Sequence, residues 1–157
     1  MKKLGMFFVL MLGIFAASCA GDDDICLHSE GTPRLKMKFK DSAGRLATLD
    51  SLYISADYGG GTQAVVQAAR VDSVLVPLRI DGSGSTLLEI RRRKAEMPAR
   101  LQLEYAEQAE YVSPACGIRK LYRDVRYQLH PAAGARAAEP AQNEITDEIR
   151  THLYITF

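Results

Sequence analysis

The stretch Arg34–Lys40, RLKMKFK, indicates the fold class more clearly than any other part of this chain. Leu35, Met37 and Phe39 alternate with cationic residues, so a strand places the apolar side chains on one face and the cations on the other. This period of two is typical of a strand with one face against a core and one in water. We therefore expect a β-strand here, followed by a turn at Asp41–Gly44.

Six further segments carry strand signals, separated by residues that favour turns. They are residues 49–55, 73–80, 86–91, 101–105, 117–129 and 149–157. In 49–55 apolar residues claim both faces, which indicates a bulge or burial on two sides. Ala132–Glu148, rich in Ala, Glu and Pro, reads as a loop with at most one helical turn. About seven short strands and no long helix predict an all-β, antiparallel β-sandwich of immunoglobulin-like architecture.

Residues 1–18 predict a lipoprotein-type signal peptide. A basic start precedes Leu4–Ala17, which carries no charge; it is shorter than the roughly 20 apolar residues that span a bilayer and fits a secretory signal. A buried N-terminal core helix is the alternative. Ala16–Cys19 resembles a bacterial lipobox, so we expect diacylglycerol and a fatty acyl group on Cys19 as the membrane anchor. Cleavage by an ordinary signal peptidase is the alternative to lipidation.

Residues 19–31 read as an acidic tether ahead of one domain at 32–157. The run Asp22, Asp23, Asp24 resembles the surface-export signal of Bacteroidetes lipoproteins, although like charges also keep any tether extended and solvated. These features predict a chain that is lipid-anchored in the outer membrane, at the cell surface or otherwise facing the periplasm.

The three cysteines divide as one plus two. If lipid occupies Cys19, then Cys26 and Cys116 remain as a candidate disulfide in an oxidising compartment. The rival interpretation makes Cys116 a nucleophile, but no histidine lies near it in sequence and an oxidising location disfavours a resting thiol.

Composition excludes some classes of protein. With 157 residues, 47% of them hydrophobic and 25% charged, the chain has the make-up of one globular domain. Twenty Lys and Arg against 19 Asp and Glu give a net charge of +1, which removes the electrostatic argument for a nucleic-acid partner. Phosphate-loop and dinucleotide fingerprints are absent, so no cofactor is expected.

Other candidate residues have simpler readings. His28, His130 and His152 lack metal-ligand spacing, so no metal site is expected. The pairs Glu104/Glu107 and Glu107/Glu110 suggest acid–base work, but strand alternation places these spacings on mixed faces, so we expect a solvated edge instead. Arg91–Lys94 suits an anionic partner or a charged strand end that deters edge pairing. The chain has no Trp, and its seven tyrosines are spread out rather than grouped as a sugar-binding platform.

The most distinctive string is Tyr111–Arg119, YVSPACGIR. Together with Asp23–Cys26, Thr32–Leu35, Leu49–Ile54 and Val76–Arg79, it resembles a family of small Bacteroidetes lipoproteins defined only as a domain of unknown function. The resemblance implies no activity, substrate or site. It supports Cys26 and Cys116 as the two cysteines beyond the lipidated one. The chain departs from the family pattern in an Ala-rich insertion at 132–141.

These observations predict a non-enzymatic binding or assembly module, held on the membrane by its lipid, with an envelope protein or glycan as partner. The alternative is a hydrolase or glycan-binding accessory protein acting on envelope polysaccharide or peptide. A hydrolase of this kind needs two buried carboxylates across a cleft, roughly 5–10 Å apart.

Overall fold

The structure, a computed structural model, describes residues 31–157. These residues form strands, turns and loops without a helix, and so include no helix that could span a membrane. The strands are β1 (Leu35–Lys40), β2 (Leu49–Asp57), β3 (Thr62–Val71), β4 (Ser73–Val76), β5 (Ser85–Arg91), β6 (Ala99–Ser113), β7 (Gly117–His130), β8 (Ala137–Pro140) and β9 (Leu153–Thr156).

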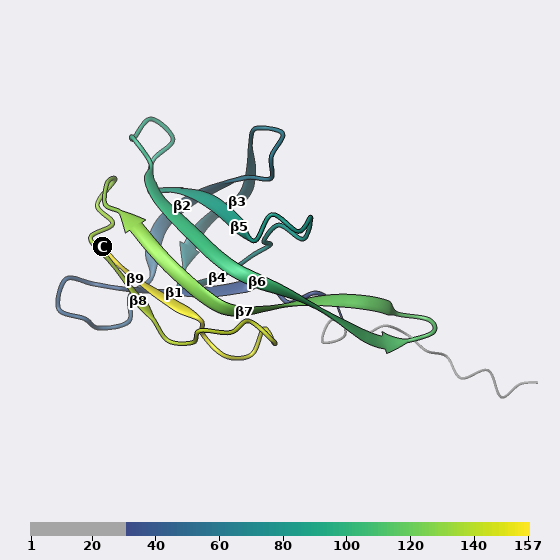
Figure 1. Cartoon of the computed structure of the whole chain (residues 1–157). Coiled ribbons are helices and arrows are strands. Elements are labelled where there is room, and N and C mark those ends of the chain that lie inside the picture. The colour runs from purple at the N-terminus through teal and green to yellow at the C-terminus, as the bar shows by residue number, and fades with distance from the viewer. Residues whose placement is uncertain (1–30) are drawn as a thin grey trace, which may run out of the picture.

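The strands form two sheets (Figure 1). One has four strands in the order β4-β1-β9-β8, and the other has five in the order β3-β2-β5-β6-β7. Neighbouring strands run antiparallel except β1 and β9, the first and last strands, which pair in parallel. The chain crosses between the sheets after β1, β3, β4 and β7, so each sheet depends on segments distant in sequence.

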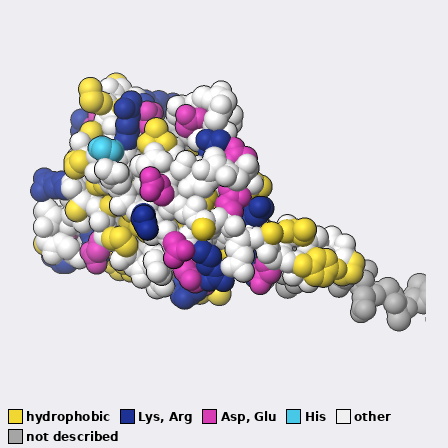
Figure 2. Space-filling view, in the orientation of Figure 1, with side chains coloured by type: hydrophobic (Ala, Val, Ile, Leu, Met, Phe, Trp, Pro, Cys, Tyr) yellow, Lys and Arg dark blue, Asp and Glu magenta, His cyan; other side chains and the backbone are white. Residues whose placement is uncertain are grey.

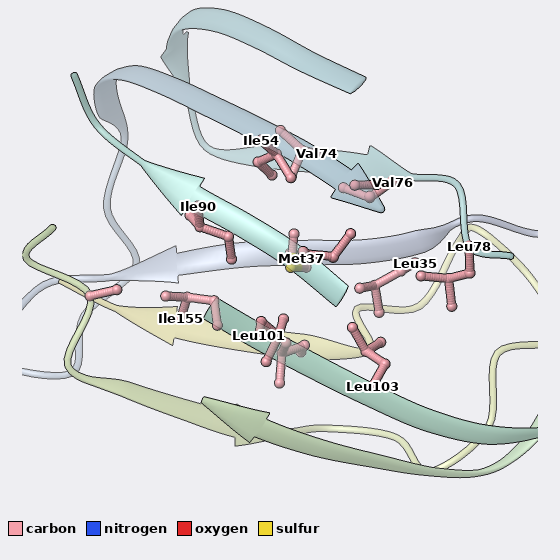
Figure 3. Packing of buried hydrophobic residues seen from close by; sticks show 14 of the residues in the cluster. Leu35, Met37, Ile54, Val74, Val76, Leu78, Ile90, Leu101, Leu103 and Ile155 are labelled. Atoms are coloured by element: carbon pink, nitrogen blue, oxygen red, sulfur yellow. The ribbon is translucent and has the colours of Figure 1, made fainter. Parts of the chain in front are cut away.

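One apolar core lies between the two sheets (Figure 3). Met37 and Val76 from the four-stranded sheet face Ile54 and Leu101 from the five-stranded sheet, and all four side chains are at most 1% exposed. Burial of such side chains contributes roughly 1.5–3 kcal/mol each relative to leaving them in water. The two-sheet, all-β prediction is therefore confirmed at the level of a β-sandwich.

The stretch that suggested the fold behaves as expected. In β1, Leu35, Met37 and Phe39 are buried, and the lysines between them are only partly covered. The polar face of β1 contacts the neighbouring strand: the Lys40 ammonium lies 4.4 Å from the centre of the Tyr154 ring on β9. The expected irregularity in 49–55 is also present, as a register shift between Ile54 and Ser55 in the pairing of β2 with β3.

The strand inventory differs from the prediction of about seven, since nine strands lie within residues 31–157. Strand β3 was missed because apolar and polar residues do not alternate in Thr62–Val71. The strand lies at a sheet edge and carries the bulge opposite β2. Strand β8 lies in the stretch predicted as a loop. The strand expected at 73–80 ends at Val76, where Pro77 has no N–H for a ladder, and the last strand begins at Leu153 rather than 149.

The predicted signal peptide (1–18) and all but the last residue of the predicted tether (19–31) lie outside the described residues.

Candidate functional site

The longest strands, β6 with 15 residues and β7 with 14, extend beyond the sheet that contains them (Figure 1). The pairing of β6 with β5 ends at Glu104, whereas its pairing with β7 continues to Ser113. Residues 106–123, here called the arm, are therefore a two-stranded ribbon projecting from the sandwich. A bulge marks its base: the register shifts between Glu104 and Ala106, and Asp124 opposite has φ 52°.

The end of the arm is apolar. Tyr111 and Ile118 stand directly opposite each other, so their side chains share one face of the ribbon, and they are 65% and 67% exposed. Tyr111 is the one tyrosine that is exposed among the described residues. Hydrophobic side chains gather over the end of the arm in Figure 2.

The turn of the arm holds Cys116. Its backbone N–H donates to Ser113 Oγ at 3.1 Å, and Gly117 supplies the positive φ of 71° that closes the turn. Cys116 is disulfide-bonded. Because it is the one cysteine within residues 31–157, the pairing with Cys26 stays a prediction.

The charged residues of the arm are balanced in pairs. Arg119 bonds Glu110, and Lys120 Nζ lies 3.4 Å from Glu107 Oε2. Arg123 also contacts a carboxylate, that of Glu144. The arm therefore carries cations near its tip without presenting a strongly positive surface.

A closed ring of hydrogen bonds lies at the base of the arm. The Arg79 N–H donates to Thr86 Oγ1 at 3.0 Å, Thr86 and Tyr105 share a 2.6 Å bond between hydroxyls, and Tyr105 donates to the Arg79 carbonyl at 2.9 Å. Since a carbonyl only accepts, the Thr86 hydroxyl is the donor to Tyr105. The ring ties the crossing between β4 and β5 to β6. Sequence reasoning missed it, because no local pattern marks residues 7, 19 and 26 apart as partners.

Two tyrosines at this base are held in the protonated form. Tyr105 and Tyr122 meet edge to face, with ring centroids 4.9 Å apart. Burial raises the pKa of Tyr105 to about 12, and it also raises the pKa of Tyr122. Each phenol donates a hydrogen bond to a backbone carbonyl, Tyr105 to Arg79 at 2.9 Å and Tyr122 to Leu78 at 3.4 Å.

The carboxylates singled out from the sequence do not share one environment. Glu104 is exposed, whereas the Glu107 side chain is 6% exposed, accepts the Gly82 N–H at 2.9 Å and faces Lys120. Glu110 is ion-paired with Arg119.

The histidines and the basic run also fall at separate places. His130 is exposed at the end of β7, and His152 is buried. Within residues 31–157 no three His, Cys, Asp or Glu side chains are grouped to hold a metal. Arg91 pairs with Glu89, and Lys94 Nζ lies 5.7 Å from the Tyr53 ring centre. Cys19, Asp22, Asp23, Asp24, Cys26 and His28 lie outside the described residues.

The opposite edge of the five-stranded sheet is β3, ten residues long and paired on one side with β2. Beside it, on the outer face of the sheet, lies a shallow depression of about 280 Å³. It is lined by Tyr53, Gln67, Arg91 and Lys94, among others.

Comparisons with known proteins add no relative: no family model, no curated protein and no solved structure matches this chain.

Proposed function

We propose that this chain is an envelope-anchored lipoprotein of the small Bacteroidetes type, and that it works as a non-enzymatic binding or assembly module. The observation that carries the binding role is the edge of β3. A partner would add an extended segment there, because main-chain groups on an outer strand can pair with another strand.

Strand β3 differs from the other edges of the two sheets. It has ten residues, and Arg70 is the one charged residue among them. The edge strands of the other sheet, β4 and β8, have four residues each, and β8 ends at Pro140. The outer edge of β7 is covered where Tyr122 bridges to Ile145. Short length, proline and cover protect the other edges against strand addition, and β3 has none of these three within residues 31–157; its own protections are the charge of Arg70 and one bulge.

Three further parts of the proposal come from the sequence. The membrane anchor is acylated Cys19. The cellular location is the outer membrane, with Asp22–Asp24 directing surface export. A Cys26–Cys116 disulfide ties the tether to the domain. The immunoglobulin-like description is proposed for the architecture alone, two packed sheets whose strands are antiparallel except for the β1–β9 pair. The observed strand orders differ from the ABED and CFG sheets of immunoglobulin domains.

Photo-crosslinking in intact cells tests the β3 edge. A benzophenone amino acid in place of Ala69 lies on the exposed strand, and the matched control replaces Gln128 on β7, which is also exposed. We expect a crosslinked adduct at 69 but not at 128, and a smaller yield when Gln67→Lys adds a cation to the same strand. Equal yields at 69 and 128 would contradict the proposal; an adduct of two copies identifies self-assembly as the partner interaction.

Metabolic labelling with palmitate tests the anchor separately. The wild-type chain should incorporate label and the Cys19→Ala variant should not. Unchanged labelling in the variant would exclude Cys19 as the lipidated residue.

The glycan-binding alternative has one observation in its favour. The depression beside β3 combines the Tyr53 ring with Arg91 and Lys94, and such a surface suits an anionic sugar. Titration with purified lipopolysaccharide tests it: Lys94→Ala should weaken binding several-fold, whereas Lys38→Ala on the other sheet should not.

A further inference from the structure

We infer that the tip of the arm is a membrane-docking surface, with Tyr111 and Ile118 inserted at the headgroup boundary of the bilayer that holds the anchor. The inference rests on the proposed lipid at Cys19, and it concerns a different surface from the β3 edge.

The apolar tip continues a face that is buried closer to the body. Side chains two apart in a strand share a face, so Tyr122, Lys120 and Ile118 lie along one side of β7. Tyr122 is fully buried, whereas Ile118 is 67% exposed. Tyr111 joins Ile118 from the paired strand. Between Tyr122 and Ile118 on this face, Lys120 pairs with Glu107, so the exposed apolar pair at the tip lies beyond an ion pair and outside the core.

The first residues of the domain lie beside the arm. Thr32, the second described residue, accepts the Lys120 N–H through its Oγ1 at 2.9 Å. Lys120 lies three residues after Gly117, the first residue of β7, and so about 10 Å along the strand from the tip. The N-terminal tether therefore joins the domain beside the arm rather than at the opposite end of the sandwich.

The tether is short enough to hold the tip at the bilayer. Thirteen peptide bonds link Cys19 to Thr32, and a fully stretched chain of that length spans at most ~45 Å. As a flexible coil its typical end-to-end distance is roughly 20 Å. The proposed Cys26–Cys116 disulfide would shorten the chain path from Cys19 to seven peptide bonds, or at most ~25 Å up to Cys26.

Side-chain chemistry favours a lipid surface. Tyrosine is common at membrane interfaces because its ring is apolar and its hydroxyl stays hydrated. The cations of the arm are already neutralised, Arg119 by Glu110 and Lys120 by Glu107. Docking should therefore depend on apolar contact and vary little with salt or with the charge of the lipid.

The arrangement also leaves the proposed partner edge accessible. The arm belongs to β6 and β7 at one side of the five-stranded sheet, whereas β3 is the outermost strand at the other side. Because β3 is not part of the arm, a tip resting on the bilayer does not itself occupy the β3 edge, so both surfaces can be used in one molecule.

The experiment uses tryptophan as a probe, since the natural chain contains none. Full-length lipidated Tyr111→Trp and Ile118→Trp variants are purified from membranes and reconstituted into vesicles of neutral phosphatidylcholine. The matched control is Met97→Trp, which replaces an 80% exposed residue in the loop two residues before β6 begins, at the end of that strand away from the tip. Circular dichroism checks that all three fold alike, and flotation of the vesicles reports the anchor independently.

We expect all three variants to float, and emission to move to shorter wavelength only with tryptophan at 111 or 118. Bromine atoms on the acyl chains should quench those two and spare 97, most strongly at shallow positions, because interfacial side chains lie roughly 5–10 Å deep. Adding anionic lipid or salt should change little.

The remaining outcomes would overturn the inference in distinguishable ways. Flotation with unquenched tryptophan at 111 and 118 leaves the anchor intact and rejects membrane docking. A wavelength shift that occurs in native membranes but not in protein-free vesicles assigns the tip to a protein partner instead. Failure of every variant to float rejects the anchor, and membrane docking with it.

Discussion

Removal of the Tyr105 hydroxyl should destabilise the fold measurably, although it adds no cavity in the core. Tyr105 is 7% exposed and closes the hydrogen-bond ring through Thr86 and the Arg79 backbone. Tyr105→Phe leaves the Arg79 carbonyl without its phenol donor and the Thr86 hydroxyl without its acceptor.

The magnitude follows from these two losses. A buried polar group left unpaired costs about 1–3 kcal/mol. Two such groups, partly relieved by local rearrangement, give an expected loss of about 2–3 kcal/mol. For a chain of this size that corresponds to a fall in Tm of roughly 5–10 °C.

Urea unfolding followed by circular dichroism measures the effect, with Tyr111→Phe as the matched control. The Tyr111 hydroxyl is on an exposed residue, so its removal should change stability by less than about 0.5 kcal/mol. Thr86→Val with Tyr105→Phe completes a double-mutant cycle. Because the two hydroxyls bond each other, the double variant should cost about 1 kcal/mol less than the sum of the single variants.

Two results would refute this reasoning. One is a loss for Tyr105→Phe no larger than that for Tyr111→Phe. The other is strict additivity of Tyr105→Phe and Thr86→Val, which would mean that the 2.6 Å contact contributes no coupling.

Two further predictions concern the core. Burial lowers the pKa of His152, whose Nδ1 accepts the Lys36 N–H at 2.9 Å, so the folded state takes up its proton at lower pH than the unfolded state. The stabilising contribution of neutral His152 is complete above about pH 6.5 and is lost as the pH falls below that value, by up to about 1.4 kcal/mol per pH unit. His152→Gln should therefore flatten the pH dependence of urea unfolding, and an unchanged pH dependence would contradict this account. Leu101→Ala should cost about 2–5 kcal/mol because the side chain is fully buried, whereas Leu46→Ala, at 64% exposure, should stay within about 0.5 kcal/mol in the same assay.

The sequence by itself determined the fold class and the buried faces of the regular strands. Alternation is a local property, because successive side chains of a strand point to opposite faces. Leu35, Met37 and Phe39 therefore identified the inner face of β1 without knowledge of any partner strand. Where a strand is an edge or is bulged, as β3 is, the alternation is lost and the sequence signal with it.

Only the tertiary structure decided where the candidate surfaces lie. Nothing in residues 62–71 shows that, among residues 31–157, no strand pairs with the outer side of β3, and nothing in 106–123 shows that β5 stops short of the arm. The Arg79–Thr86–Tyr105 ring and the Thr32–Lys120 contact join residues up to 88 apart in the chain. Such contacts follow from the packing of whole sheets, so the tertiary fold, rather than any local pattern, brings the tether to the arm.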